Sequence, residues 1–509
     1  MKKRQSEYKP LLFTTTLRNP ERLKWFLAVL KEYDGQILDD KLAKKIAGEI
    51  IRIGLYTPAK LTGAVKKKIK EKDFLTDKEV LKVLKNNPQN HKEAGFSKGW
   101  PSRFDTWFKI AKELGFVFYK AGEKIRLSEI GLKLVDSEHP GFEQQAFLNA
   151  FVKYQSNNPF RRVLNENVPL ILLLKVIKKL NADEDFNNAG ISKLELPLVI
   201  YWKNNDAEKL YLRIKKLRKD FSYSPSWEVI SEICRDEIMQ GKDIVRNNKS
   251  IMVDYPDEFI RKMRLTGLIS LRGGGRFVDI NKNEQEKVEY VLENYSEYEK
   301  YDTEEAYFKY VSMIDENLVS LVSKPILISE QNKFLTKWVN VYSWDTIKLE
   351  MLNLSKKHLT KDDILRYLSN PVRLEFLTTL AVKSKFPNIK VIPNYPVDDE
   401  GLPTSTAGGV ENKGDIECYE NVNGVLIEVT MSEGRTQTMM EVWPITRHLE
   451  EFGKQTKNSM CYFIAPSIFR DSVRQIKFVK KEDNLFISPK TIEEFLEHLD
   501  SSDVLYTSA

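Results

Sequence analysis

Two carboxylates on either side of a turn are the clearest candidates for chemistry in this sequence of 509 residues. Asp415 lies near the start of segment 414–419, and Glu428 lies within segment 425–430. Both segments have the residue pattern of β-strands, and Asn423-Gly424 between them favours a hairpin. Carboxylates are hard oxygen ligands that suit Mg²⁺, and the ion activates water and neutralises charge when a phosphodiester is attacked in line.

The register of this hairpin decides how close the two carboxylates come. With any loop of even length, four residues share one face of the sheet: Asp415, Glu417, Glu428 and Thr430. A two-residue loop that pairs Asp415 with position 432 would leave Glu428 about 13 Å along the strand, at roughly 3.3 Å per residue. A four-residue loop, 421–424, puts Asp415 opposite Thr430 and Glu428 on the diagonal, within roughly 7–8 Å. We therefore predict the four-residue loop, since it lets both carboxylates share a metal ion.

A further acidic residue, Glu375, lies in an apolar helical stretch that begins near Asn370-Pro371. An unpaired carboxylate is costly to bury. Glu375 therefore either turns toward solvent or belongs to a buried polar site.

Two stretches upstream repeat one order of elements: a helix, a tight hairpin and a second helix. The expected strands are 116–119 and 125–127 in the first stretch, and 268–271 and 277–280 in the second. This is the order of a winged helix-turn-helix, so we predict two DNA-recognition modules. Two unrelated hairpins beside helices are the alternative.

Basic and aromatic residues of these stretches are the candidate DNA contacts, because arginine suits guanine edges and lysine suits phosphates. The candidates in the first module are Trp100, Arg103 and Lys109, and those in the second are Arg261, Arg264, Arg272 and Arg276. The basic stretch 203–219 between the modules adds Arg213 and Lys215 as phosphate contacts. The alternative for that stretch is a solvated helix face.

The charge reverses between Glu284 and Glu305, where nine acidic residues face two lysines. An acidic helix is repelled by phosphates, so this segment suits a connector or a mask better than a DNA contact. We predict four parts: winged-helix recognition subdomains at 1–145 and 146–290, a helical acidic linker at 291–343, and an α/β domain at 344–509. The fold class is multidomain, largely α with α/β.

The composition limits the classes of protein to which this chain can belong. A net charge of +7 with 41% hydrophobic and 30% charged residues is typical of a globular protein and permits nucleic acid as a partner. Three distant cysteines argue against a disulfide framework and a Cys-rich zinc site, and five scattered histidines argue against an HExxH site. The longest apolar run, Val168–Leu174, is far below the ~20 residues that span a bilayer. We expect a cytoplasmic protein without membrane contact.

The order of a helix with Glu375, then Asp415, then a strand with Glu428 resembles the PD-(D/E)XK nuclease core. Two longer segments make the resemblance more specific: Phe13-Thr-Thr-Thr-Leu-Arg-Asn-Pro-Glu-Arg22 and Met431-Ser-Glu-Gly-Arg-Thr-Gln-Thr-Met-Met-Glu-Val-Trp-Pro-Ile-Thr-Arg-His-Leu449. They are similar to the AlwI group of type IIS restriction endonucleases, which includes site-specific nicking enzymes. The resemblance runs the length of the chain.

This resemblance implies a C-terminal PD-(D/E)XK-like nuclease domain that uses Mg²⁺. The implied metal ligands are Asp415, Glu428 and Glu375, and Glu441 and His448 on the following helix complete the catalytic set. Glu441 and His448 are seven residues apart, so they share one helix face. Double-stranded DNA is the implied partner, and a cognate DNA methyltransferase protects the host where both strands are cut.

One position departs from the nuclease pattern, since Thr430 stands where a lysine is usual. Threonine carries no positive charge for the attacking hydroxide. His448 with Glu441, a second metal ion, or a movement of Lys413 or Arg435 could take over, or activity could be lost.

The leading hypothesis is a type IIS-like endonuclease that binds a short asymmetric sequence and cuts at a fixed distance outside it. The chain has one catalytic set, so cutting both strands requires a transient homodimer or a small nuclease subunit, and otherwise the enzyme nicks one strand. The alternatives are a winged-helix DNA-binding regulator without nuclease activity and a structure-selective repair nuclease.

Overall fold

The computed structural model describes residues 22–70, 75–93, 95–136, 141–161, 163–186, 190–242, 247–324, 326–404 and 413–507. They form two compact units. The first comprises the described parts of Met1–Ile50 and Pro88–Lys324, and the second those of Ile51–Asn87 and Pro325–Ala509. Segment 13–21, which contributes to the family resemblance, lies outside the described residues.

The units divide the chain differently from the predicted domain limits. The predicted recognition subdomains, 1–145 and 146–290, both contribute to the first unit, but residues 51–87 belong to the second. The predicted linker, 291–343, is divided after Lys324. Its first part packs on the first unit because Tyr307 is buried and its hydroxyl accepts a hydrogen bond from the Gln155 amide at 3.0 Å.

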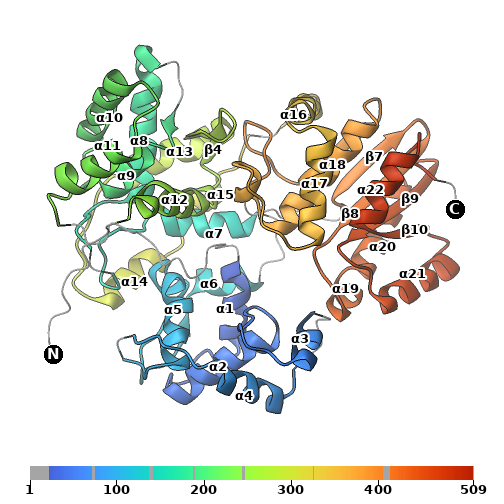
Figure 1. Cartoon of the computed structure of the whole chain (residues 1–509), viewed down its shortest axis with the longest axis horizontal. Helices are drawn as coiled ribbons and strands as arrows, with labels where there is room; N and C mark the ends of the chain where they lie inside the picture. The colour runs from blue at the N-terminus through green and yellow to red at the C-terminus, as the bar shows by residue number, and fades with distance from the viewer. Residues whose placement is uncertain are drawn as a thin grey trace. The chain divides into compact units, whose positions relative to one another are not determined.

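The first unit is mostly helical (Figure 1). Its helices are α1 (Leu23–Lys31), α2 (Asp40–Arg52, which ends in the second unit), α5 (Trp100–Glu113), α6 (Glu129–Asp136), α7 (Phe142–Phe151), α8 (Pro169–Ala182), α9 (Leu196–Tyr201), α10 (Ala207–Phe221), α11 (Trp227–Glu232), α12 (Tyr255–Arg264), α13 (Gln285–Asn294), α14 (Glu304–Ser312) and α15 (Glu316–Ser320). Within the described residues, every helix of the chain is too short or too polar to cross a membrane.

The first predicted helix–hairpin–helix order is confirmed. Helix α5 is followed by β1 (Val117–Phe118), which pairs antiparallel with β2 (Arg126–Leu127), and then by α6. The Ser128 hydroxyl accepts a hydrogen bond from the Gly131 amide at 3.1 Å, as expected for a helix cap. A Cβ at Gly131 would lie 2.1 Å from the Phe116 carbonyl oxygen, so glycine lets α6 pack directly against the hairpin.

The second helix–hairpin–helix order is confirmed as well. Helix α12 precedes β4 (Ile269–Arg272) and β5 (Phe277–Ile280), which pair antiparallel, and α13 follows. The strand β3 (Ile191–Ser192) pairs with the outer edge of β5. In the first module, an isolated bridge between Ile37 and Lys124 adds a comparable third segment beside the hairpin.

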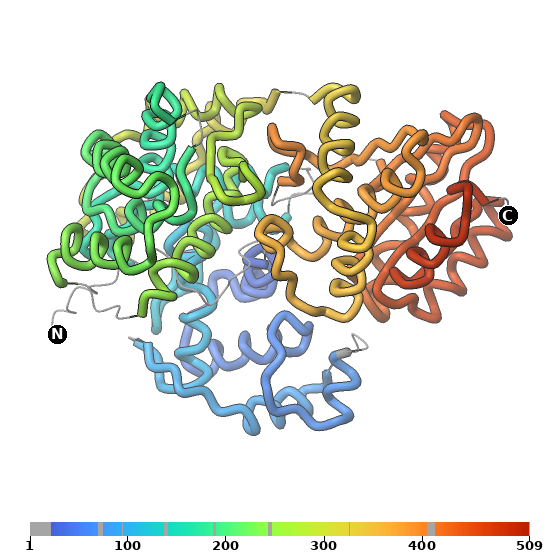
Figure 2. The backbone as a smooth tube through the Cα atoms, turned by 45° about the horizontal axis from the view of Figure 1, so that its top comes forward, coloured from blue at the N-terminus to red at the C-terminus, as the bar shows by residue number. Residues whose placement is uncertain are grey.

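The second unit contains a mixed five-stranded sheet in the order β10-β9-β8-β7-β6. The strands are β6 (Lys390–Pro393), β7 (Ile416–Glu420), β8 (Asn423–Val429), β9 (Asn458–Ala465) and β10 (Ile487–Thr491). The helices of this unit are α3 (Gly63–Lys70), α4 (Asp77–Asn86), α16 (Ile328–Val341), α17 (Trp344–Ser355), α18 (Asn370–Lys385), α19 (Arg435–Met440), α20 (Val442–Gly453), α21 (Arg470–Asp483) and α22 (Ile492–Ser501). β6, β7 and β8 are antiparallel, whereas β8, β9 and β10 are parallel. The helical crossovers between the parallel strands can be followed in Figure 2 from orange to red.

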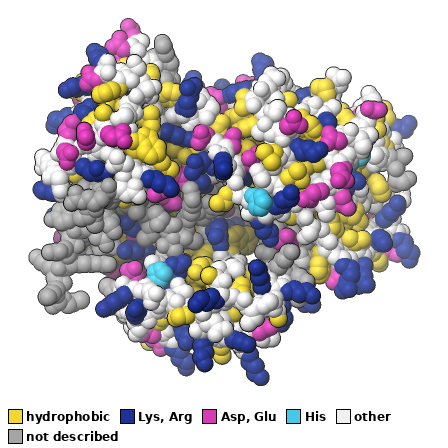
Figure 3. Space-filling model, viewed as in Figure 1, with side chains coloured by type: hydrophobic (Ala, Val, Ile, Leu, Met, Phe, Trp, Pro, Cys, Tyr) yellow, Lys and Arg dark blue, Asp and Glu magenta, His cyan; other side chains and the backbone are white. Residues whose placement is uncertain are grey.

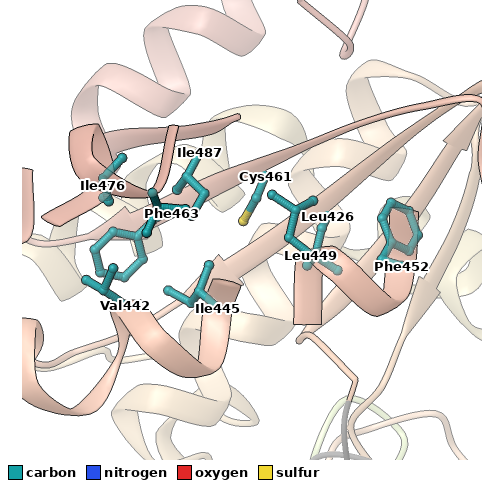
Figure 4. Close-up of a cluster of buried hydrophobic side chains, with 10 residues drawn as sticks. Leu426, Val442, Ile445, Leu449, Phe452, Cys461, Phe463, Ile476 and Ile487 are labelled. Carbon is teal, nitrogen blue, oxygen red and sulfur yellow. The ribbon is translucent and has the colours of Figure 1, made fainter. Parts of the chain in front are cut away.

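The sheet is covered by helices on both faces. On one face, α20 and α21 place Leu449 and Ile476 in a buried apolar cluster with Leu426 of β8 and Phe463 of β9 (Figure 4). On the other face, the Tyr462 ring contacts the rings of Phe495 and His498, which lie on α22. Successive residues of β9 therefore face opposite helices, as a strand buried on both sides requires.

The predicted four-residue loop between β7 and β8 is wrong. Glu420 pairs with Asn423 and Ile416 pairs with Ile427, so the turn consists of residues 421 and 422. Asn421 adopts a φ of +57°, which asparagine tolerates better than most residues. Gly424 lies inside the strand, where a Cβ would meet the Phe452 ring at 2.7 Å, so glycine serves close packing there rather than the turn.

Candidate active site

The observed turn brings the two predicted carboxylates closer than the expected register would. Extending the β7–β8 ladder by one residue places Asp415 directly opposite Glu428, and both side chains share one face because the loop length is even. An Asp415 Oδ2 accepts a hydrogen bond from the Val429 amide at 2.8 Å. This bond ties the Asp415 carboxylate across the hairpin.

Two residues that the sequence analysis missed hold Asp415 in place. The Asn394 amide donates to the Asp415 carbonyl oxygen at 2.9 Å, and Asn394 Nδ2 donates to the Gly414 carbonyl oxygen at 2.7 Å. A Cβ at Gly414 would lie 2.5 Å from Glu428 Oε1, so glycine makes room for that carboxylate. The glycine directly before the aspartate was the available signal in the sequence, whereas nothing local marked Asn394.

The α20 side of the site supplies Glu441 and His448. His448 Nδ1 lies 2.8 Å from Glu428 Oε1, and Thr430 Oγ1 donates to Glu441 Oε1 at 2.8 Å. Because β8 and β9 are parallel, the connecting helix runs back along β8. The residue at its start, Glu441, therefore meets the strand end at Thr430, and His448 meets Glu428 two turns later.

Glu375 lies on α18 and is partly buried. Burial raises its pKa well above the ordinary value, and the negative charge of Asp415 raises this pKa further. The structure thus brings Glu375 into electrostatic reach of the carboxylate pair, which favours the buried polar site over the solvent-facing alternative.

The carboxylates of the site repel one another. Burial raises the pKa of Asp415 well above its ordinary value, and the charges of Glu428 and Glu441 add to this, while the bond from the Val429 amide opposes it. Burial also raises the pKa of Glu428 well above its ordinary value, with contributions from Glu441 and Glu375. Burial lowers the pKa of His448. A bound cation stabilises a cluster of neighbouring carboxylates of this kind, because its positive charge offsets their mutual repulsion.

The carboxylate oxygens of this site are the type of ligand that Mg²⁺ prefers. Among the described residues, no group of three or more His, Cys, Asp or Glu side chains is arranged to hold a metal ion. Mg²⁺ at sites of phosphodiester chemistry usually takes one or two carboxylates and fills its other positions with water and phosphate oxygens. The buried Glu428 opposite the partly buried Asp415 fits that requirement. Glu375 does not complete a three-residue set with them.

A buried glutamine, also missed from the sequence, joins the ends of β8 and β9. Gln437 Nε2 donates to the carbonyl oxygens of Ser432 at 3.1 Å and Ser467 at 2.9 Å. Its Oε1 accepts from the Phe469 amide at 2.8 Å. All of these bonds connect loops that follow strands, so Gln437 fixes the segment that carries Glu441.

The predicted DNA contacts of the first module lie on or near α5. Arg103 stacks over the Trp107 ring at 5.3 Å and lies 2.8 Å from His91 Nε2. Lys109 is partly buried. Trp100 is buried against Trp107, so its ring belongs to the core of this module rather than to its surface.

Most predicted DNA contacts of the second module and the basic stretch contact carboxylates. The ion pairs are Arg213–Glu237, Lys215–Asp183, Arg261–Asp257 and Arg272–Asp279. Arg264 is 3% exposed. Arg276, in the turn between β4 and β5, is exposed, and of the eight predicted basic contacts, all of them described, it is the only one in that class.

Other basic side chains are more accessible. On α21, the side chains of Arg470, Arg474 and Lys481 are 75%, 70% and 81% exposed. Figure 3 shows Lys and Arg side chains gathered over this helix. Three acidic residues lie on the same helix and weaken the basic signal of its sequence.

A family model described as AlwI restriction endonuclease matches residues 112–333 and 308–498, which together cover more than half of the chain. A search among curated proteins found no significant match. Among solved structures, the small subunit (R.BspD6I2) of the heterodimeric restriction endonuclease R.BspD6I matches at 24% identity, over 30% of this chain and 75% of its own, with a TM-score of 0.26. Restriction endonuclease FokI matches at 12% identity over 95% of both chains with a TM-score of 0.25, and FokI bound to DNA at 12% over 96% of both with the same score. At these low TM-scores, the family assignment rests on the family model alone.

Proposed function

Because the chain belongs to the AlwI restriction endonuclease family, we propose that it is a site-specific DNA endonuclease with its catalytic site on β7, β8 and α20. The observation that carries the proposal is the placement of Asp415 opposite Glu428, with His448 and Glu441 on the same face of the sheet. This is an acidic site of the kind that can hold a metal ion for phosphodiester hydrolysis, with a histidine beside it.

In this proposal Asp415 and Glu428 hold Mg²⁺, and Glu375 adds negative charge beside them. When bound, Mg²⁺ supplies the polarisation of the scissile phosphate and the activation of water. The chain's own residues set the geometry: the Val429 amide orients Asp415, and His448 orients Glu428. An ionised carboxylate only accepts hydrogen bonds, so His448 carries a hydrogen on Nδ1 and, when neutral, keeps a lone pair on Nε2.

We assign DNA recognition to the two helix–hairpin–helix modules of the first unit, read as winged helices. Binding of a short asymmetric sequence there, with cleavage at a fixed distance outside it, is the type IIS mode of action. Arg276 is the best-placed of the predicted contacts, since its side chain is exposed at the tip of the β4–β5 hairpin.

The described residues form one proposed catalytic set, so a monomer would cut one strand. Cutting both strands would need a transient homodimer or a small nuclease subunit. In a host, double-strand cutting would also require a cognate DNA methyltransferase.

The test is digestion of supercoiled plasmid and phage DNA by the purified full-length protein, with Mg²⁺ and with EDTA. Discrete linear fragments that require Mg²⁺ are expected for double-strand cleavage, and open circles for nicking. Asp415→Ala should abolish both products. Glu450→Gln, at an exposed acidic position on α20, is the matched control and should cut normally.

The outcome that would overturn the proposal is intact DNA in every lane together with a shifted band in a binding gel. That result would favour the DNA-binding regulator. Cleavage of junctions or flaps without sequence preference would instead favour the repair nuclease.

A further inference from the structure

Thr430 occupies the position where the nuclease pattern has a lysine, and its hydroxyl is fully engaged within the protein. Thr430 Oγ1 lies 2.8 Å from Glu441 Oε1 and accepts a hydrogen bond from the Ser432 amide at 3.0 Å. The residue is 8% exposed. The hydroxyl therefore contacts two protein partners at the edge of the carboxylate site.

The direction of these bonds follows from the chemistry of the groups. A hydroxyl has one hydrogen to donate and lone pairs to accept with. The Ser432 amide can only donate, so it uses a lone pair of Thr430. The ionised Glu441 carboxylate can only accept, so it receives the hydrogen. Thr430 then has no hydrogen left to donate to a substrate phosphate or to water.

Four hydrogen bonds close a ring around this contact. Thr430 donates to Glu441, the Glu441 amide donates to the Gln437 carbonyl oxygen at 3.1 Å, and Gln437 Nε2 donates to the Ser432 carbonyl oxygen at 3.1 Å. The Ser432 amide completes the ring at Thr430. Both the backbone and the carboxylate of Glu441 are thus tied to the loop that follows β8. A closed ring of this kind holds a side chain in one orientation.

We propose that Thr430 is a positioning residue that fixes Glu441 by one oxygen and leaves its second oxygen for water or the metal ion at the Asp415–Glu428 pair. The inference rests on the proposed function. In this chain the lysine position orients a carboxylate instead of supplying a positive charge. The charge of Glu441 contributes to the raised pKa of both Asp415 and Glu428, as expected for a carboxylate close to the pair.

The test compares Thr430→Val, which keeps the shape but removes the donor, with Thr430→Ser, which keeps the donor. Thr446→Val is the matched control, because Thr446 is a buried threonine of α20 whose hydroxyl donates to the Val442 carbonyl oxygen within its own helix. The measurements are the single-turnover cleavage rate with Mg²⁺, the KM for DNA, and the affinity of the DNA-free protein for Mn²⁺ by calorimetry.

The Thr430→Val variant should cleave about 10–100-fold more slowly, the usual cost of losing a residue that orients a site ligand. Its KM for DNA should not change, and Thr430→Ser should recover most of the rate. A parallel fall in Mn²⁺ affinity would place the second oxygen of Glu441 on the ion. An unchanged Mn²⁺ affinity with the slower rate would place it on the attacking water, and either result supports the positioning role.

Equal rates for Thr430→Val and the natural protein would overturn the inference, as would a Thr430→Ser variant as slow as Thr430→Val. These outcomes differ from failure of the proposed function. If the natural protein does not cut DNA with Mg²⁺, the nuclease proposal itself fails. If it cuts and Thr430→Val cuts equally fast, only the role of Thr430 is lost.

Discussion

In the first unit four buried cations each contact a buried carboxylate, whereas in the second unit the carboxylates around Asp415 lie close to one another. These pairs are Arg161–Glu113, Arg218–Glu195, Lys262–Glu258 and Lys287–Glu284. Among the described residues, no lysine or arginine forms an ion pair with Asp415, Glu428 or Glu375. The neighbouring charges that shift the pKa values of these three carboxylates are those of other acidic side chains.

This difference separates charges that serve the fold from charges that serve chemistry. In a buried pair each partner offsets part of the hydration that the other loses, so the pair is compatible with a stable fold. A cluster of like charges is unfavourable for folding and persists where a bound ion uses it. The contrast therefore supports the proposed placement of the catalytic site in the second unit.

The strongest test of this contrast is Glu428→Gln. The amide keeps the shape of the side chain and still accepts from His448, but it removes a negative charge from the proposed metal site. Cleavage should fall by at least about 10³-fold, roughly 4 kcal/mol of lost transition-state stabilisation. The free energy of unfolding should stay equal or rise, because repulsion with Glu441 and Glu375 is relieved.

Plasmid cleavage and urea denaturation of the same preparation measure both effects. Glu450→Gln again serves as the control for a carboxylate lost from α20. A Glu428→Gln variant that cuts normally, or one that unfolds more easily than the natural protein, would contradict the separation of roles.

The opposite behaviour is expected when a pair of the first unit is broken. Arg218 donates to both Glu195 oxygens at 2.8 Å and to the Gly190 carbonyl oxygen at 2.6 Å. Arg218→Met leaves the Glu195 carboxylate buried with the Ser192 amide as its remaining donor. The free energy of unfolding should fall by roughly 3–5 kcal/mol, as measured by urea denaturation.

The double variant Arg218→Met with Glu195→Gln is the control and should recover part of the loss, because no buried charge is left unpaired. Arg218 also lies in the basic stretch for which the sequence suggested phosphate contact. A variant with normal stability and weaker DNA binding would instead indicate that Arg218 contacts a DNA phosphate, as predicted for this stretch.

The sequence predicted the order of elements better than their exact contacts. Both helix–hairpin–helix stretches form as expected, because in each a helix is followed by two β-rich segments on either side of a tight turn and then by a second helix. The shared face of Asp415 and Glu428 was also predictable, because parity does not depend on which even loop closes the hairpin. The loop itself was not, since Gly424 is required by the nearby Phe452 ring, which is 28 residues further along the chain.

Partners that lie far away in the sequence explain the remaining gaps. Asn394 and Gln437 support the site through contacts with backbone atoms, which no residue pattern indicates. The carboxylates that contact Arg213 and Arg272 could not be assigned before the fold was known. A basic residue in a sequence therefore indicates DNA contact only weakly until its neighbours are identified.

The smallest expected effect concerns Lys153, a buried cation of the first unit that is only incompletely compensated. Burial lowers its pKa from 10.5 to about 8, and the charge of Asp315 opposes this shift. Its ammonium group donates to Asn149 Oδ1 at 3.1 Å and to the Met313 carbonyl oxygen. Between about pH 8 and pH 10.5 the unfolded chain binds a proton that the folded chain does not, so this residue makes stability rise with pH.

Below pH 8 both states are protonated, and the full cost of burying the ammonium group, at most about 3 kcal/mol, is present. Lys153→Met removes that cost. The variant should therefore be more stable than the natural protein at pH 7, and the difference between their free energies of unfolding should shrink as the pH approaches 10.5. Comparing the two proteins cancels the other lysines and tyrosines that titrate in this range. A difference that stays constant from pH 7 to pH 10.5 would mean that Lys153 titrates normally, and that even this cation is as well compensated as Arg218.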